Sequence, residues 1–261
     1  MNCLGTAHAI RCGMASVEIP WTKSSSGITP TNDEAHVWCV NLDLPPSATS
    51  ELFKILTPDE QQRADQYKFE RGRTRFITAR SMLRRLLGNA LQQDPSALTF
   101  RYTERGKPEL TVAGEGQLRF NVSHSDALAL IALTRSHAVG VDLERIRPVT
   151  YVREIADRFF TDRESAALAL LPEAEQTTAF FNLWTRKEAW LKATGDGIAE
   201  ALKRVEVSFL PAEPACILDI AGSPKGATEW TLMDLKPAEG FTGALAVQAK
   251  DLNVLCRQWV E

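Results

Sequence analysis

Cysteine is scarce in this sequence, and no two cysteines stand in a C-x-x-C pair. The 261 residues contain five of them, an odd number at scattered positions, so the spacing predicts neither a zinc site nor a disulfide framework. A chain of this kind suits a reducing cytoplasm best.

Long apolar runs are also lacking. No segment reaches the roughly 18 apolar residues that a membrane helix needs, so we expect no membrane partner. Residues 1–14 lack the charged start and long apolar core of a signal peptide. Residues 23–33 are rich in Ser, Thr, Gly and Pro, and we predict that residues 1–34 are either a poorly ordered leader or a stretch ahead of a functional start at Met14.

A large net charge is absent too. The chain carries a net charge of −3, so no global field draws it to nucleic acid. Its hydrophobic and charged fractions, 44% and 24%, are those of an ordinary globular protein. The length suffices for one large domain or two small ones.

Both helical and strand patterns are present. Apolar spacing predicts helices over residues 71–90, 151–160 and 173–194, the last stopped by Gly195, and a capping box at Thr161 opens another. We predict strands over residues 36–43, 98–102, 117–122, 127–133, 138–144, 205–209, 216–220, 229–235 and 243–248, with 127–133 and 138–144 forming a hairpin. The order favours an α+β fold of two similar halves, residues 35–140 and 141–261.

Three carboxylates stand in a pattern that suits a magnesium ion. Asp142 and Glu144 end an apolar strand at positions i and i+2, so their side chains share a face. Glu188 lies on the long helix, with Lys192 one turn later. Magnesium prefers a few carboxylates together with waters and substrate phosphates. The alternatives are two solvent-exposed acids and an exposed helical ion pair.

Lys187 lies in an apolar stripe. Phe180, Trp184, Lys187 and Leu191 share one helical face, and a buried ammonium needs an anion. The residue is therefore either a lysine whose ammonium reaches solvent or one that faces a carboxylate or phosphate at a cleft.

A basic segment runs from Lys68 to Arg85. Seven basic residues and one acid fall within it, on a chain that is slightly acidic overall. A solvated helix face is one interpretation. The other is a phosphorylated ligand, because the forked donors of arginine suit phosphate. Nucleic acid is less favoured, because the chain as a whole is slightly acidic.

Residues 121–126 read Asn-Val-Ser-His-Ser-Asp at the end of a strand. A Ser–His–Asp triad is excluded, because Ser123 and His124 point in opposite directions in an extended chain and no G-x-S-x-G elbow surrounds them. A serine, a histidine and turn amides do suit a phosphate-binding turn. Lys107, in the turn Arg-Gly-Lys-Pro, adds a further cation.

Together these motifs resemble those of the Sfp-type 4′-phosphopantetheinyl transferases, which activate carrier proteins of fatty-acid, polyketide and nonribosomal-peptide synthesis. The two acidic motifs, in this order and spacing, are specific to that family. The resemblance covers about residues 35–210. The matching segments are residues 71–80, 106–108, 121–125, 139–144, 158–160 and 181–192.

The resemblance implies a pseudo-twofold α+β protein, usually a single chain, with coenzyme A between the halves. Asp142, Glu144 and Glu188 correspond to ligands of Mg²⁺, for which Mn²⁺ can substitute. Glu188, Lys192 and Glu164 are the implied catalytic residues. The candidate coenzyme A contacts are Arg71, Arg75, Lys107, Ser123, His124, Lys187 and Lys192.

The implied reaction moves 4′-phosphopantetheine from coenzyme A to a serine of an acyl or peptidyl carrier protein and releases 3′,5′-ADP. Glu188 would assist removal of the serine proton, and Lys192 would stabilise the leaving group. Two alternatives stay open. One is a Mg²⁺-dependent phosphohydrolase of a coenzyme A-like substrate, and the other is a non-catalytic coenzyme A-binding module.

Overall fold

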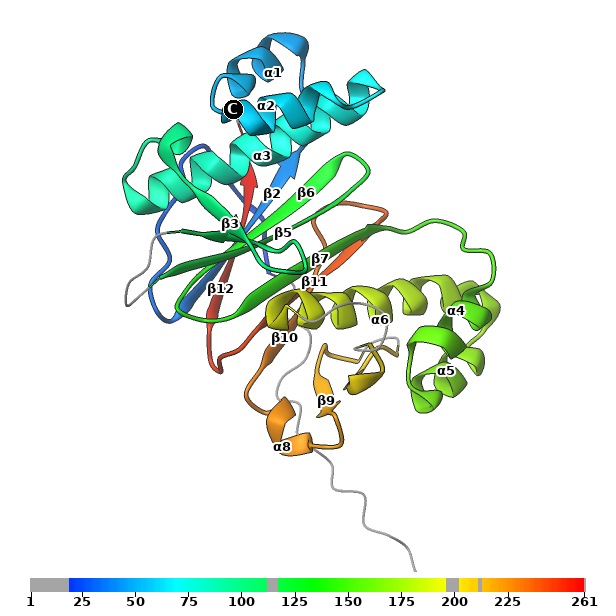
Figure 1. The fold of residues 1–261 in the computed structure, drawn as a ribbon. Coiled ribbons are helices and arrows are strands. Elements are labelled where there is room, and N and C mark those ends of the chain that lie inside the picture. Colours follow the sequence, from blue (N-terminus) through cyan, green and yellow to red (C-terminus); the bar gives the residue numbers. More distant parts are fainter. Residues whose placement is uncertain (1–18, 112–116, 196–201, 211–212, 261) are drawn as a thin grey trace, which may run out of the picture.

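Two β-sheets lie between two long helices in this α+β chain (Figure 1). The computed structural model describes residues 19–111, 117–195, 202–210 and 213–260. Helix α3 (Glu70–Leu91) covers the outer face of the first sheet, and helix α6 (Glu173–Thr194) covers the outer face of the second. Each half of the molecule is thus one sheet with one 22-residue helix.

The first sheet has five strands and the second has three. The order in the first is β1 (Thr22–Ser24), β12 (Asn253–Trp259), β2 (Glu34–Asn41), β6 (Leu128–Arg135), β5 (Leu118–Ser125). The order in the second is β10 (Thr231–Leu235), β11 (Phe241–Val247), β7 (Val139–Arg145). Two small ribbons pair β3 (Phe100–Tyr102) with β4 (Pro108–Leu110) and β8 (Val205–Val207) with β9 (Ile217–Ile220).

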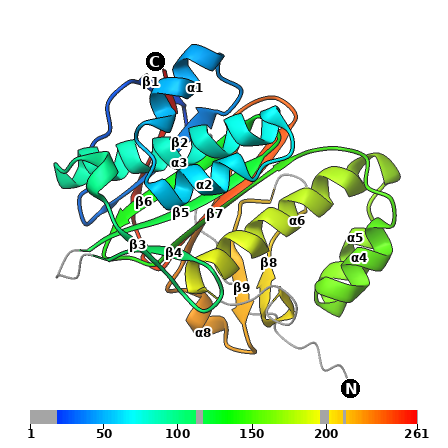
Figure 2. The ribbon, with the colours of Figure 1, turned by 45° about the horizontal axis from the view of Figure 1, so that its top comes forward.

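Shorter helices flank the two layers. Helices α1 (Pro46–Phe53) and α2 (Pro58–Asp65) pack on α3, and α4 (Val152–Phe159) and α5 (Asp162–Ala169) pack together beside α6 (Figure 2). Helix α8 (Pro224–Ala227) follows β9, and residues 95–97 and 202–204 form single 3₁₀ turns. None of the described helices is long and apolar enough to cross a bilayer.

Three apolar clusters hold the layers together. One lies between α3 and the first sheet, and another lies between α6 and the second. The third joins the inner faces of the two sheets, with Val37 and Ala132 from one and Val141 and Leu245 from the other. Strand β7 contributes Val139, Val141 and Leu143 to the third cluster, and its other face lies against α6 at Gly140, so both faces of this strand are covered.

The helix boundaries agree closely with those that the sequence predicts. Helix α6 spans the predicted residues, and Gly195 ends it with a φ of 78°, a left-handed value that glycine adopts at little cost. The capping box at the start of α5 is present, with Thr161 and Glu164 bonding each other's backbone N–H.

The predicted hairpin of residues 127–133 and 138–144 is wrong. Strand β6 pairs with β2 and β5, whereas β7 pairs with β11 in the other sheet. The hairpin partner of β6 is β5, which continues through Ser125. Residues 121–125 are therefore strand, and not the phosphate-binding turn that we predicted.

The ends of the chain complete the first sheet. Strand β12, from the C-terminal part of the chain, pairs in parallel with β2, and β1 pairs with β12. Residues 19–34, part of the predicted leader, thus belong to the fold, while residues 1–18 lie outside the described part of the chain. The predicted boundary at residue 140 falls inside β7.

Candidate active site at the seam between the sheets

The seam is the line along which residues 121–125 of β5 meet residues 141–145 of β7. Alternate side chains of β5 point across it, as strand geometry dictates. Each accepts a backbone N–H of β7. The three bonds run from Val141 to Asn121 Oδ1 (3.0 Å), from Leu143 to Ser123 Oγ (3.2 Å) and from Arg145 to Ser125 Oγ (3.1 Å). Side chains of β5, the edge strand of the first sheet, thus connect it to β7, the edge strand of the second sheet.

Both acids of β7 are held from the same strand. Ser123 donates to Asp142 Oδ1 at 2.9 Å, and Ser125 donates to Glu144 Oε2 at 3.0 Å. Lys192, in the last turn of α6, donates to the same Asp142 oxygen at 2.6 Å and to Ser123 Oγ at 2.9 Å. Two carboxylates, two hydroxyls and one ammonium therefore meet at the seam.

Glu188 reaches the same place because α6 presses against β7. A Cβ at Gly140 would lie 2.0 Å from the carbonyl oxygen of Ala189, so only glycine allows this approach. Burial, with smaller contributions from Asp142 and Glu144, raises the pKa of Glu188 to about 7. Burial and the charge of Asp142 also raise the pKa of Glu144. The three acids thus repel one another in a poorly hydrated place.

Two oxygens at the seam lack a partner. Asp142 Oδ2 and Glu188 Oε1 are buried and have no hydrogen-bond partner among the described residues. Buried polar atoms are normally satisfied, so such atoms indicate a missing ligand. The donor set, carboxylate oxygens alone, suits a hard cation such as Mg²⁺. As the side chains stand, no three His, Cys, Asp or Glu residues of the described chain are already gathered as a metal centre.

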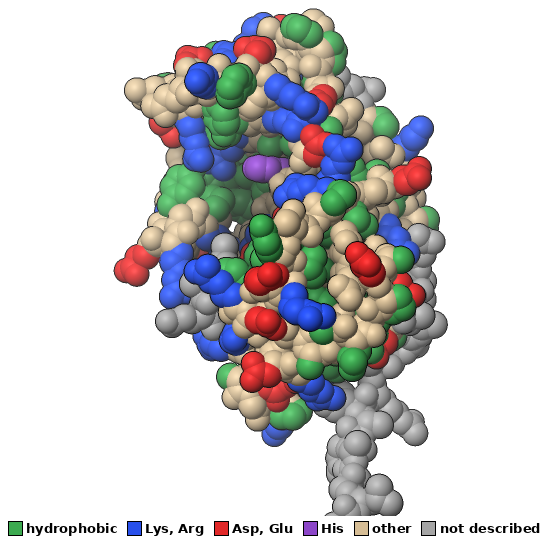
Figure 3. Space-filling model, turned by 90° about the vertical axis from the view of Figure 1, so that its right-hand side faces the viewer, with side chains coloured by type: hydrophobic (Ala, Val, Ile, Leu, Met, Phe, Trp, Pro, Cys, Tyr) green, Lys and Arg blue, Asp and Glu red, His purple; other side chains and the backbone are tan. Residues whose placement is uncertain are grey.

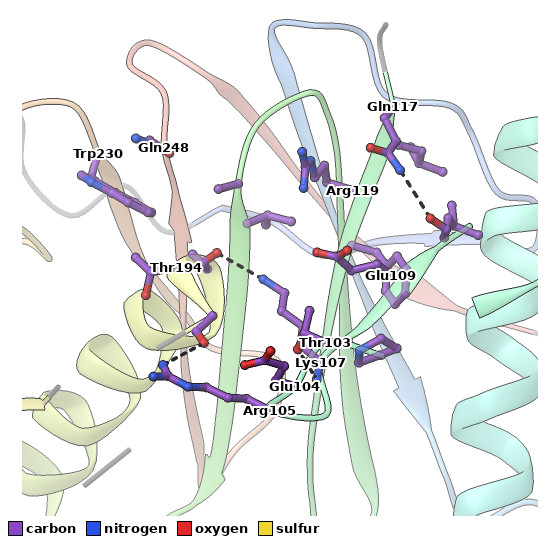
Figure 4. A pocket seen from close by; sticks show the side chains of 18 residues that line it. Thr103, Glu104, Arg105, Lys107, Glu109, Gln117, Arg119, Thr194, Trp230 and Gln248 are labelled. Carbon is purple, nitrogen blue, oxygen red and sulfur yellow. Dashed lines mark hydrogen bonds between the residues drawn. The ribbon is translucent and has the colours of Figure 1, made fainter. Parts of the chain in front are cut away.

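The turn between β3 and β4 docks on the end of α6. Lys107 Nζ donates to the carbonyl oxygens of Lys192 and Ala193, the latter at 3.1 Å, and Arg105 donates to that of Gly195 (Figure 4). These cations lie where the helix dipole is negative. They border a cavity of about 800 Å³, which Thr194 and Trp230 also line. Burial lowers the pKa of Lys107.

A second cavity, of about 650 Å³, opens between α2, α3, the β3–β4 turn and the end of β5. Arg75, Tyr102, Gly106 and His124 are among its lining residues. The face shown in Figure 3 carries a histidine in a hollow surrounded by Lys and Arg side chains. This cavity, here called the basic groove, combines cations with apolar walls.

The arginines at the basic groove are paired with acids. Arg75 holds Asp43 through two bonds of 2.6 and 2.9 Å and reaches Asp126 at 2.9 Å. Arg71, which is mostly exposed, bonds Asp43 at 3.2 Å and Asp126 at 3.3 Å. The Arg75 guanidinium holds the pKa of each of these acids below its usual range. Arg71 and Arg75 thus share Asp126, which lines the groove together with Arg75 and His124.

Lys187 and Glu164 lie away from the seam, inside the C-terminal half. Lys187 is fully buried and donates to Glu164 Oε2 and, at 2.7 Å, to the carbonyl of Val205. The other Glu164 oxygen accepts the N–H of Val207 at 3.0 Å. The anion that Lys187 needs is thus a protein carboxylate. Both residues are buried within the C-terminal half, and neither lines the basic groove.

Sequence reasoning missed the roles of Asn121 and Ser125. The signal was available, because Asn121, Ser123 and Ser125 alternate with Val122 and His124 along an apolar strand. Alternation places all three polar side chains on one face. The pattern does not reveal that this polar face of β5 meets β7, the edge strand of the second sheet.

Comparison with known families assigns this arrangement to a class of protein. Residues 138–245 match the 4′-phosphopantetheinyl transferase superfamily, and residues 45–136 match the family described as 4′-phosphopantetheinyl transferase, N-terminal. The chain belongs to the 4′-phosphopantetheinyl transferase superfamily.

Named relatives agree with the family. The chain is 40% identical to the 4′-phosphopantetheinyl transferase HetI of Nostoc over 228 residues, which is 87% of this chain and 93% of the relative. It is 28% identical to the 4′-phosphopantetheinyl transferase Sfp of Bacillus subtilis over 60% of this chain and 67% of that protein. The protein is thus an enzyme that moves phosphopantetheine from coenzyme A to carrier proteins.

Proposed function

We propose that this transferase is Mg²⁺-dependent, releases 3′,5′-ADP and performs its chemistry at the seam. The observation that carries the proposal is the pair of buried, unpartnered oxygens on Asp142 and Glu188 beside the ammonium of Lys192. When bound there, Mg²⁺ or Mn²⁺ would neutralise charge on the pyrophosphate of coenzyme A. Asp142, Glu144 and Glu188 are the residues that would hold it.

The protein's own groups then have separate tasks. The hydroxyl oxygen of the carrier serine forms a bond to the β-phosphorus, and the bond from that phosphorus to the 3′,5′-ADP oxygen breaks. Glu188 takes the serine proton, directly or through water. Lys192 Nζ, held at Asp142 and Ser123, donates to the departing phosphate oxygen.

The basic groove supplies a place for the nucleotide end of coenzyme A. Arg75 and His124 line it, Arg71 bonds its lining residue Asp126, and Tyr102 offers a ring for the base. Lys107 reaches the end of α6, so we assign it the support of Lys192. If the groove reads the 3′-phosphate, dephospho-coenzyme A should bind about tenfold more weakly, and Arg75→Ala should abolish that difference. Equal dissociation constants in wild-type protein would place the 3′-phosphate elsewhere.

An apolar hollow of about 330 Å³ adjoins the seam at Glu144. Glu144, Val149, Ile155, Phe181 and Trp184 are among its lining residues. Nearby, Tyr151 and Leu170 are exposed, whereas Phe160 and Leu168 are buried. We assign this region to the carrier protein, because apolar side chains flanked by Arg153, Arg158 and Arg163 suit an acidic helical partner.

Intact-mass spectrometry tests the proposal. An apo-carrier protein incubated with this enzyme, coenzyme A and Mg²⁺ should gain one phosphopantetheine on a single serine while 3′,5′-ADP appears. The same reaction with excess EDTA should give unmodified carrier. Free phosphopantetheine with unmodified carrier would instead indicate a phosphohydrolase, and neither product would indicate a binding module.

The site is complete within one chain, since both sheets contribute to it. We therefore propose that the enzyme acts as a monomer, and we place it in the cytoplasm on the scattered cysteines alone. Gel filtration with light scattering tests the first of these, and an obligate dimer would contradict it.

A further inference from the structure

The hydroxyls of Ser123 and Ser125 each act both as a hydrogen-bond acceptor and as a hydrogen-bond donor toward β7. As an acceptor, each hydroxyl takes a backbone N–H of β7, which joins the sheets. As a donor, each hydroxyl holds a carboxylate of β7. A hydroxyl has one proton and two lone pairs, so it can do both at once. The contacts that join the two halves are therefore the contacts that orient the acids.

The two serines differ in their other partners. Ser123 also receives the ammonium of Lys192, and it is among the candidate coenzyme A contacts. Among the described residues, the Ser125 hydroxyl has two hydrogen-bond partners, Glu144 Oε2 and the N–H of Arg145. The side chain of Ser125 is therefore the one whose removal changes the orientation of an acid without changing Lys192.

We propose that Ser125 is a positioning residue for Glu144. Its hydroxyl fixes the carboxylate of Glu144 at the seam, so that the acid lies ready on the same face as Asp142. Without the hydroxyl, the Glu144 side chain gains rotational freedom and must lose it again when a cation binds. The proposal rests on the proposed function, since it takes Glu144 as a cation ligand.

Asn121 provides a matched control. It accepts the N–H of Val141 across the same seam, at 3.0 Å, yet it holds no carboxylate. Asn121→Ala and Ser125→Ala each leave one backbone N–H of β7 without its acceptor, whereas only Ser125→Ala also releases an acid. Thermal stability should fall similarly in both variants, while cation affinity should fall in one.

The experiment is a Mn²⁺ titration followed by electron paramagnetic resonance, with coenzyme A saturating. The Mn²⁺ dissociation constant should rise about tenfold in Ser125→Ala, as for loss of a group that orients a metal ligand. It should stay at the wild-type value in Asn121→Ala and be restored in Ser125→Thr, which keeps the hydroxyl. Coenzyme A affinity in EDTA should be the same in all of these proteins.

A double-variant cycle completes the test. In the Glu144→Ala background, Ser125→Ala should weaken Mn²⁺ binding no further, because the carboxylate that the Ser125 hydroxyl orients is then absent. If Ser125→Ala folds poorly, Ser125→Cys keeps the volume with only a weak hydrogen bond, and the same rise is expected.

Two results separate the possible failures. If wild-type protein binds Mn²⁺ but Ser125→Ala binds it equally well, or Asn121→Ala weakens it as much, the positioning role is overturned and the proposed function stands. If wild-type protein binds no Mn²⁺ at the seam, the cation assignment and the positioning role are both overturned.

Discussion

Two lysines of helix α6 each pair with a carboxylate, but one pair maintains the fold and the other lies at the candidate active site. Lys187 meets Glu164 and Lys192 meets Asp142, five residues further along α6. The first pair is sealed, with side-chain exposures of 0% and 2%, whereas Lys192 is 29% exposed. Buried pairs hold together only if their remaining atoms are satisfied.

The difference lies in the oxygens that remain. Both oxygens of Glu164 are occupied, by the N–H of Thr161, the N–H of Val207 and the ammonium of Lys187. Asp142 uses one oxygen for Ser123 and Lys192 and leaves the other without a partner. A satisfied buried charge maintains structure, while an unsatisfied one beside solvent is prepared for a ligand.

The largest effect is expected from Asp142→Ala. Removing this acid should lower kcat/KM at least about 10³-fold, equivalent to about 4 kcal/mol of transition-state stabilisation, because the cation and Lys192 both lose an anchor. The unfolding temperature should change much less than the activity, because the lost bonds to Ser123 and Lys192 are offset by relief of the repulsion among the three acids. Steady-state kinetics on an apo-carrier measures the first, and calorimetry measures the second. Activity close to wild type, with or without EDTA, would remove Asp142 from the site.

The sealed pair should behave in the opposite way. Lys187→Met leaves the Glu164 carboxylate buried without its cation, which should cost about 3–5 kcal/mol of unfolding free energy. Under conditions where the variant is folded, its coenzyme A dissociation constant should equal that of the wild type. Urea denaturation and calorimetry give the two quantities.

A compensating variant sharpens this result. Lys187→Met/Glu164→Gln removes both charges, so much of the lost stability should return. Weak coenzyme A binding by a fully stable Lys187→Met protein would instead bring Lys187 into the active site.

The acidity of Glu188 gives the seam a pH dependence that the sealed pair lacks. Its folded pKa of about 7 lies above the ordinary 4.5, so between these values the native state binds more protons than the unfolded state. Stability in EDTA should therefore fall as pH rises from about 5 to about 8, by up to about 3 kcal/mol relative to Glu188→Gln. Saturating Mg²⁺ should flatten the curve, because it favours the ionised carboxylate. Parallel curves for the two proteins would show that Glu188 does not titrate in this range.

The sequence predicted what depends on short stretches of chain. The bounds of α6 follow from its acidic first turn and Gly195, and the shared direction of Asp142 and Glu144 follows from the strand period. The apolar stripe correctly indicated that Lys187 needs an anion. It could not identify Glu164 as that anion, because the two residues meet only when α5 packs on α6.

Long-range pairing was the part that sequence patterns could not supply. Residues 127–144 look like a hairpin, since two apolar strands flank a short turn, yet β7 finds its partner in β11, about one hundred residues later. Strand β12 was not predicted and pairs with β2 from the opposite end of the chain. The seam exists only because these distant pairings place β5 and β7 edge to edge.

The smallest effect is expected at the basic groove, where charges are satisfied but exposed. Asp43 is 39% exposed and binds Arg71 and Arg75, so Asp43→Asn should change the unfolding free energy by no more than about 1 kcal/mol. Coenzyme A should bind about two- to fivefold more tightly at low salt, because both arginines then keep their donors for phosphate, and salt should remove the gain.

Asp65→Asn is the control for that measurement. Asp65 is also exposed and pairs at 3.0 Å with Arg73. Arg73 lies on α3, as Arg71 and Arg75 do, but unlike Arg75 it does not line the groove. Replacement of Asp65 changes the net charge equally, so any general attraction of coenzyme A to a less acidic protein should appear in both variants. Calorimetric titration at two salt concentrations separates the cases. Tighter binding confined to Asp43→Asn would show that Asp43 competes with the phosphates of coenzyme A for the donors of Arg71 and Arg75. Equal gains in both variants would show that only the net charge of the protein matters. Arg71 and Arg75 would then have a structural role, as Lys187 and Glu164 do.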